Sequence, residues 1–123
     1  MRTLLIVLQL AVALGLLNVW LLRFNRSTAY RGGDASSMRE EFARYGLPLW
    51  SMWLIGVLKV GAALCLIAGL WLPFLVLPAA VLISALMIGA LAMHLKIRDP
   101  LKKSLPALLV LAASVCIGWA STR

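Results

Sequence analysis

Acidic residues are scarce in this chain, which has four Asp and Glu against twelve Lys and Arg. None of the four acids lies in a long apolar segment, and proton-coupled membrane carriers usually need an intramembrane acid. The two cysteines, Cys65 and Cys116, form no Cys-x-x-Cys pair, so a thioredoxin-like or zinc site has no support. The single histidine, His94, is a weak signal for a metal, and we predict no metal site.

Apolar residues are abundant instead. They make up 63 % of the 123 residues, and the mean hydropathy is +1.00. A soluble domain is roughly 45–50 % apolar, and so short a chain cannot bury the excess in a globular core. A membrane-spanning helix needs about 20 mostly apolar residues. Three apolar segments, at residues 3–22, 49–72 and 74–95, have this length, and a fourth at residues 105–120 is shorter. We therefore predict an all-α integral membrane protein, a bundle of four transmembrane helices that forms a single domain over residues 1–123.

The net charge of +8 predicts the orientation of this bundle. Residues 23–48 and 96–104 contain nine Lys and Arg, whereas the other side has Arg2, Arg123 and an uncharged hairpin tip. Basic loops stay on the cytoplasmic side, so we expect both termini outside, in a bacterial cytoplasmic (inner) membrane. No nucleic-acid recognition motif accompanies the charge, so the expected partner is the lipid bilayer and not nucleic acid. Tryptophans are expected to mark the inner interface (Trp20, Trp50 and Trp53) and the outer one (Trp71 and Trp119).

The first basic loop is predicted to contain a short amphipathic helix over residues 38–45. Ser37 and Glu40 have the spacing of a capping box, and apolar side chains recur on one helical face as far as Tyr45. The helix would lie on the bilayer surface or on the bundle. A soluble cap with a disordered lead-in over residues 23–36 is the alternative.

Lys59 is the one Lys or Arg inside a predicted span. It lies about 15 Å from Leu49 and about 20 Å from Leu72 along a helix, close to the bilayer midplane. A charge there costs about 2.5–3.5 kcal/mol, so such a residue is expected to face the bundle interior and to mark a functional site. Polar residues at similar depth on the other three spans are candidates for a polar layer around it: Gln9, Ser84 and Ser114.

Three alternatives to a polar layer stay open for Lys59. In the first, Glu40 or Glu41 reaches inward to pair with it, and in the second its amine is uncharged. The third is an anionic or carbonyl-bearing ligand, such as a quinone or a lipid head group. The main competing interpretation of the residue is a structural lysine that binds backbone carbonyls and only fixes the helix packing.

Two further pairs of residues are expected at matching depths. His94 and Asn18 lie near the cytoplasmic ends of two spans, and we predict a hydrogen-bonded contact there rather than a ligand or a proton carrier. Cys65 and Cys116 lie toward the outer side, and the sequence leaves open whether they meet. Two small apolar core residues are the favoured interpretation.

Small residues are expected to let the helices pack closely. Gly56 and Gly61 lie in the second span, and Ala85 and Gly89 have small-xxx-small spacing in the third. Such residues allow helix backbones to approach each other in lipid. We therefore predict that these positions are helix–helix contacts.

Several short motifs are specific as a set. They are Arg31-Gly32-Gly33, Glu41-Phe42, Tyr45-Gly46-Leu47-Pro48, Gly56, Lys59-Val60, Met87, Gly89-Ala90, His94, Asp99-Pro100 and Pro106-Ala107. Over residues 18–107 the chain thereby resembles the DoxX-like family of small four-helix membrane proteins. The resemblance implies the four-helix fold. Its relatives range from a membrane subunit of a thiosulfate:quinone oxidoreductase to accessory or chaperone-type proteins, so the resemblance implies the activity poorly.

Three functional hypotheses follow, in this order. The first is a non-catalytic membrane subunit or accessory protein that docks a protein partner through its basic cytoplasmic face. Candidate partner-facing loop residues are Arg31, Glu40, Glu41 and Tyr45. The second is a component of quinone-linked, thiosulfate- or sulfur-type redox chemistry, with a quinone or lipid near Lys59. No cofactor is evident from the residues, and a quinone is the one left open. The third is a small transporter. Because there is no redox cysteine pair, haem ligand pair or nucleotide motif, the sequence favours a protein that is not itself an enzyme.

Overall fold

The computed structural model describes residues 2–25 and 30–122, and the elements in these ranges are all helical. The long helices are α1 (Arg2–Leu17), α3 (Leu49–Ala68), α4 (Val76–Lys96) and α5 (Leu101–Ser121). A π-helical segment, η1 (Asn18–Leu22), continues α1, and a 3₁₀ turn, η2 (Pro73–Leu75), precedes α4. The short helix α2 (Met38–Arg44) lies between η1 and α3.

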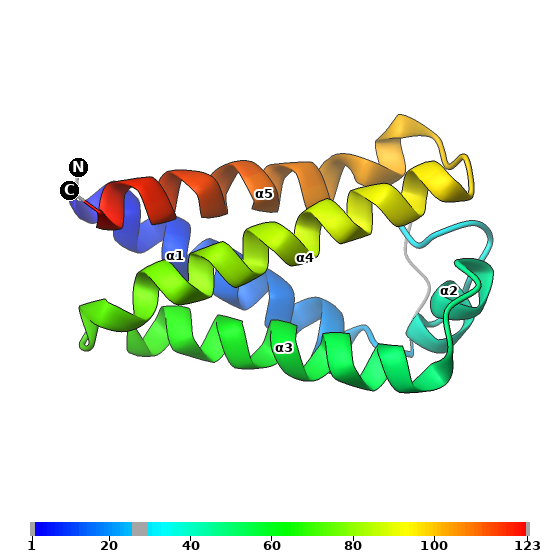
Figure 1. Ribbon diagram of the computed structural model, residues 1–123, viewed down its shortest axis with the longest axis horizontal. Coiled ribbons are helices and arrows are strands. Elements are labelled where there is room, and N and C mark those ends of the chain that lie inside the picture. The colour runs from blue at the N-terminus through cyan, green and yellow to red at the C-terminus, as the bar shows by residue number, and fades with distance from the viewer. Residues whose placement is uncertain (1, 26–29, 123) are drawn as a thin grey trace.

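Four segments within the described residues are long and apolar enough to cross a membrane: Arg2–Leu22, Leu49–Ala68, Pro73–Lys96 and Leu101–Ser121. They run back and forth as a four-helix bundle, so the predicted all-α transmembrane fold is confirmed (Figure 1). Both termini lie at one end of the bundle with the α3–α4 hairpin. The opposite end, which we name the α2 end, carries α2 and the α4–α5 connection.

Two helix boundaries differ from the predicted ones by four residues. Helix α3 ends at Ala68 rather than Leu72, because the chain turns through Gly69 before Pro73, which cannot continue a helix. Helix α5 begins at Leu101 rather than Leu105, directly after Pro100. Hydropathy missed this first turn because it contains lysines, whose charge does not prevent helix formation.

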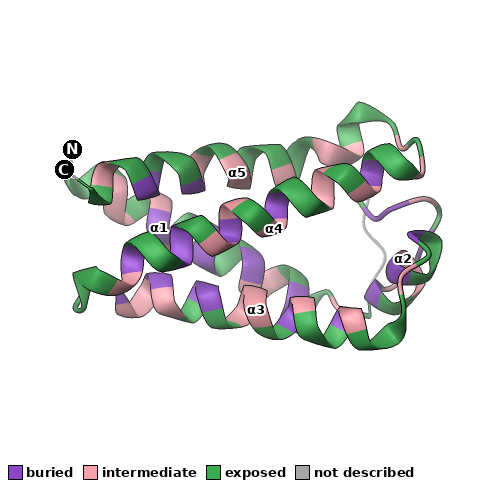
Figure 2. Ribbon diagram, viewed as in Figure 1, coloured by how far each residue is buried: buried purple, intermediate pink, exposed green. Residues whose placement is uncertain are grey.

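Buried residues line the inside of the bundle, and exposed apolar residues cover its outside (Figure 2). Four of the five tryptophans are exposed, as a membrane-facing position requires: Trp50, Trp53, Trp71 and Trp119. Trp20, predicted at the membrane interface, is instead 7 % exposed. It packs inward onto Phe42 of α2, so it does not face lipid as the other four tryptophans do.

The buried core has two parts. One joins the long helices in the half away from α2, with members such as Ala13, Leu66 and Ile83. The other lies at the α2 end, where Trp20, Met38, Phe42 and Met52 pack together. Helices α3 and α4 diverge toward this end, so the second core does not fill the space between the helices (Figure 1).

Candidate functional site

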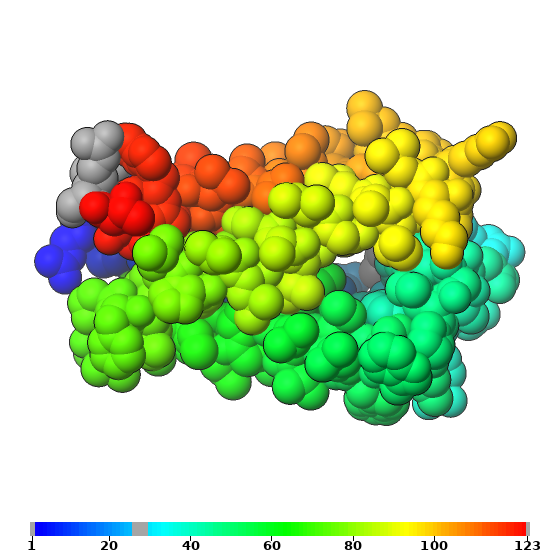
Figure 3. Space-filling view, viewed as in Figure 1, coloured from blue at the N-terminus to red at the C-terminus, as the bar shows by residue number. Residues whose placement is uncertain are grey.

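A cavity of about 920 Å³ occupies the α2 end of the bundle. Its walls come from α1, η1, α3, α4 and α5, and α2 with its flanking loop closes it at the end. Figure 3 shows the surface hollowed between the C-terminal part of α4 and the beginning of α3. Most of the lining is apolar. The polar or charged lining residues are Asn18, Arg23, Tyr30, Arg31, Glu41, Tyr45, Lys59, His94 and Lys103.

Helix α2 is built as its sequence predicts. The Ser37 hydroxyl accepts a hydrogen bond from the backbone N–H of Glu40 at 3.2 Å, which caps the helix. The Glu40 carboxylate in turn accepts from the backbone N–H of Ser36 at 3.2 Å. Gly46, at φ +76°, adopts the left-handed conformation that ends such a helix. The apolar face carrying Phe42 is buried, so α2 lies on the bundle. The alternative was a soluble cap with a disordered lead-in over residues 23–36, of which residues 26–29 lie outside the described residues.

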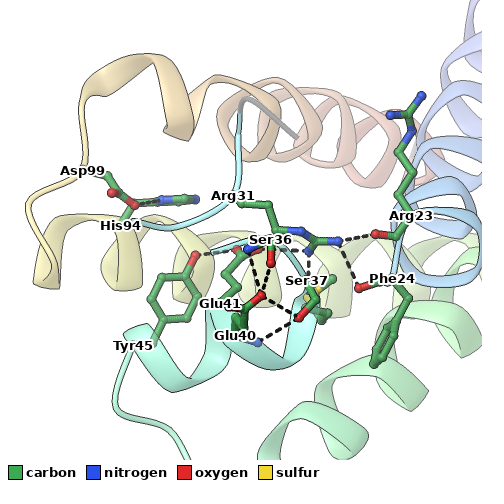
Figure 4. A network of polar contacts seen from close by, with 11 residues as sticks. Arg23, Phe24, Arg31, Ser36, Ser37, Glu40, Glu41, Tyr45, His94 and Asp99 are labelled. Atoms are coloured by element: carbon green, nitrogen blue, oxygen red, sulfur yellow. Dashed lines mark hydrogen bonds and ion pairs between the residues drawn. The ribbon is translucent and has the colours of Figure 1, made fainter. Parts of the chain in front are cut away.

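Arg31 is the centre of a buried polar network at the end of the cavity (Figure 4). Its Nη1 lies 3.1 Å from Glu41 Oε2, and the two side chains are 4 % and 13 % exposed. Its Nη2 donates to the backbone carbonyls of Arg23 and of Phe24, the latter at 3.2 Å. Tyr45 Oη donates to the other Glu41 oxygen at 2.6 Å. This network ties the end of η1 to α2.

The prediction that Arg31, Glu41 and Tyr45 face a partner was wrong, because all three point into the bundle. Gly32 makes this possible: a Cβ there would lie 2.6 Å from the Tyr45 ring, so only glycine lets the loop pass so close. Burial, and next the negative charge of Glu41, raise the pKa of Tyr45 well above its usual range. Tyr45 is therefore a neutral hydrogen-bond donor. Glu40 lies at the surface, where its carboxylate accepts from the backbone N–H of Ser36 just before α2.

His94 pairs with Asp99 rather than with Asn18. The His94 Nδ1 lies 2.7 Å from Asp99 Oδ2, with side chains 7 % and 4 % exposed. The other Asp99 oxygen accepts from the backbone N–H of Gly33 at 3.0 Å, so the first loop is fastened to the α4–α5 connection. Tyr45 packs edge-on against the His94 ring, 5.9 Å between centroids. Asn18 lines the same cavity as His94, but the predicted contact between them is replaced.

Asp99 is the site residue that sequence reasoning missed. It lies directly before Pro100 and five residues after His94, just past the end of α4. In the sequence it appears only as part of the motif Asp99-Pro100 in a polar loop, with no partner assigned. The signal available was that this acid follows the only histidine closely enough to fold back on it.

Lys59 faces the cavity from α3, with its Nζ 5.5 Å from the centroid of the Trp20 ring. A cation over the face of an indole is attracted by the ring quadrupole. Among the described residues the ammonium group forms no hydrogen bond or ion pair. Glu41 does reach into the cavity, as one of the alternatives for Lys59 predicts, but its carboxylate binds Arg31 and Tyr45.

The predicted polar layer around Lys59 does not form. Gln9 Nε2 donates to the backbone carbonyl of Leu66 at 3.2 Å, in the other half of the bundle. Ser84 donates back to the carbonyl of Ala80 on its own helix at 2.8 Å, as hydroxyls in apolar helices do. Ser114 is buried. None of these three side chains lines the cavity, because sequence gives the depth of a residue but not the direction it faces.

Cys65 and Cys116 are both free thiols. Cys65 is half-buried, and Cys116 is exposed on the outside of α5, so the core position predicted for Cys116 was wrong. In the described ranges no three His, Cys, Asp or Glu side chains gather closely enough to hold a metal ion. What the lining of the cavity offers to a ligand is hydrogen-bond donors, charged groups and apolar surface.

These features define a multi-pass helical membrane protein with a largely apolar cavity at one end of its bundle. The model of the DoxX-like family matches residues 7–117, so the chain belongs to the DoxX-like family. A similar protein is the uncharacterized protein YdgD of Bacillus subtilis (strain 168). It is 32 % identical over 79 residues, covering 63 % of this chain and 69 % of the relative. No solved structure matches the chain.

Proposed function

We propose that the protein binds a lipid-soluble, carbonyl-bearing small molecule of the quinone class, and that Lys59 donates a hydrogen bond to one of its carbonyls. The observation that carries this proposal is the ammonium group of Lys59, which faces a largely apolar cavity and lies over the Trp20 ring but forms no hydrogen bond or ion pair in the described part of the chain. A charge in the hydrocarbon is costly unless something pairs with it. A ligand carbonyl supplies that partner.

The depth of Lys59 favours a quinone over a phospholipid. Lys59 lies about 15 Å along α3 from Leu49, where the helix begins at the α2 end. Phospholipid head groups stay at the bilayer interface, whereas an uncharged ring with two carbonyls enters the hydrocarbon. The volume of about 920 Å³ lies in the range typical of small-molecule sites, about 300–1,000 Å³. The mostly apolar lining suits a ring with an apolar tail.

The accessory-subunit hypothesis is compatible with this site. Binding a quinone requires no redox group in this chain, and a partner protein would supply or remove the electrons. Since Arg31, Glu41 and Tyr45 point inward, the surface left for such a partner is the exposed basic one that includes Arg39 and Lys102. Docking of a partner there stays a prediction, as does the third hypothesis, a small transporter.

We further propose that the α2 end is cytoplasmic and that the membrane is the bacterial inner membrane, since the basic loops lie at this end. Reporter fusions at the N- and C-termini are expected to give a periplasmic signal, with a matched fusion in the α4–α5 connection giving a cytoplasmic one. Alkaline phosphatase activity reports the periplasmic side, and the fluorescence of green fluorescent protein reports the cytoplasmic side. Cytoplasmic termini would contradict the orientation and would leave the cavity proposal untouched.

The binding proposal is tested with Lys59→Met, which keeps an unbranched side chain, one atom shorter, but removes the donor. The full chain in nanodiscs is titrated with a short-tailed naphthoquinone, and quenching of tryptophan fluorescence reports binding near Trp20. We expect the apparent Kd to rise about tenfold, the loss of one hydrogen bond to a charged group.

Lys102→Met is the matched control, since Lys102 is exposed and does not line the cavity, and its Kd should equal that of the wild type. An alkylnaphthalene with the same tail but no carbonyl separates site binding from partition into lipid. The proposal is wrong if quenching by the quinone is the same in the wild type and in Lys59→Met, or if the wild type binds the hydrocarbon as tightly as the quinone.

A further inference from the structure

Two glycines line the cavity without being needed for packing. A Cβ added at Gly15 of α1 or Gly89 of α4 would meet no neighbouring atom of the described residues within 4 Å. Gly56 differs from them in being tightly packed, since a Cβ there would lie 2.7 Å from the Trp20 ring. The prediction that Gly89 forms a small-xxx-small helix contact was therefore wrong, because no atom of another described helix lies within 4 Å of that Cβ position.

Glycine in a helix interior costs about 0.8–1.0 kcal/mol relative to alanine. In membrane proteins this cost is usually offset where a second backbone approaches closely. Within residues 2–25 and 30–122, no second backbone comes within 4 Å of a Cβ added at Gly15 or Gly89. Both glycines are exposed and line the cavity that Lys59 faces, so the space above them is open to a ligand in that cavity.

The surroundings of Gly89 continue this open surface. Ala85, one turn earlier on α4, also lines the cavity, and both residues are exposed, which places them where the cavity opens. The surface is hollowed between α4 and α3, two helices whose outer faces carry exposed apolar side chains such as Ile88 and Leu54 (Figure 3). In a membrane these faces contact lipid tails, so a lipid-soluble molecule reaches the cavity without crossing water.

We propose that the ring of the ligand lies against the bare α4 backbone at Gly89, and that the missing side chains at Gly89 and Gly15 set how bulky a ring the cavity admits. This inference rests on the quinone site proposed above and adds its size selection. Lys59 fixes the carbonyl end of the ring, and the two glycines fix the clearance for its body. A single-ring benzoquinone and a two-ring naphthoquinone are distinguished by that clearance.

The test uses Gly89→Ala and Gly89→Leu in the full chain, titrated with a benzoquinone and a naphthoquinone that carry the same short tail. Gly89→Leu should weaken binding of both by at least about tenfold, since its side chain takes the place of the ring. Gly89→Ala should weaken the naphthoquinone about threefold to tenfold and the benzoquinone less than about twofold. Thermal stability should stay the same or rise, because the added atoms enter open space.

Gly61→Leu is the matched control. A Cβ at Gly61 also meets nothing within 4 Å among the described residues, but Gly61 does not line the large cavity, so its variant should bind both quinones like the wild type. Equal binding by the wild type and Gly89→Leu overturns the inference and leaves the quinone site standing. A fall in stability at Gly89→Ala also overturns it, since that is the result of a packing glycine. No quinone binding by the wild type overturns the proposed function, and the inference with it.

Discussion

Replacing Arg31 with methionine is expected to lower the free energy of unfolding by about 3–5 kcal/mol, the cost of leaving a buried carboxylate without its partner. Arg31 and Glu41 lie 3.1 Å apart with little exposure to solvent. The variant also leaves the carbonyls of Arg23 and Phe24 without their donor. Since these bonds tie the end of η1 to α2, the cover of the cavity should loosen before the four spans do.

The measurement is reversible unfolding of the protein in detergent micelles, followed by circular dichroism. Arg39→Met is the matched control, because Arg39 is exposed on α2, and its effect should stay within about 0.5 kcal/mol. The double variant Arg31→Met/Glu41→Gln should be less destabilised than the sum of its single variants, since both remove the same pair. If Arg31→Met unfolds like Arg39→Met, the network does not hold the cover in place.

Replacing Gly56 with alanine is expected to cost about 2–3 kcal/mol, near the upper end of the usual range for overpacking. The added Cβ would lie 2.7 Å from the Trp20 ring, a distance that forces a shift. The ring has little freedom, because it contacts Phe24 and Phe42 at centroid distances of 6.0 and 6.1 Å. Any shift also moves Trp20 away from Lys59, so quinone affinity should fall together with stability.

Gly61→Ala provides the matched control on the same helix, since a Cβ there meets nothing within 4 Å among the described residues. It should be neutral or slightly stabilising, because alanine is the better helix former. Near-ultraviolet circular dichroism should change in Gly56→Ala and not in Gly61→Ala, because Trp20 packs against Gly56 alone of the two. Equal stability of the two variants would show that Trp20 yields freely, and would remove the rigid support assumed for Lys59.

Some of the candidate site was predictable from the sequence and some was not. Lys59 stood out because a charge in an apolar span is costly wherever it faces. The prediction of a polar layer of Gln9 and Ser84 around Lys59 is wrong, since matching depth says nothing about rotation around the helix axis. The sequence predicts a hydrogen-bonded His94, but its partner Asp99 comes from a loop whose path the sequence does not reveal.

The sequence by itself determined the four spans, the capped helix α2 and the absence of a carboxylate within the spans. Each follows from local physics: hydropathy over about 20 residues, the hydrogen bonds of a helix start, and the cost of charge in lipid. Only the tertiary structure decided that Arg31, Glu41 and Tyr45 point inward and that Gly89 lies open. These facts depend on how α3 and α4 diverge and on which face each helix turns to its neighbours. In lipid both the outer and the inner faces of a spanning helix are apolar, so the sequence does not reveal which face is which.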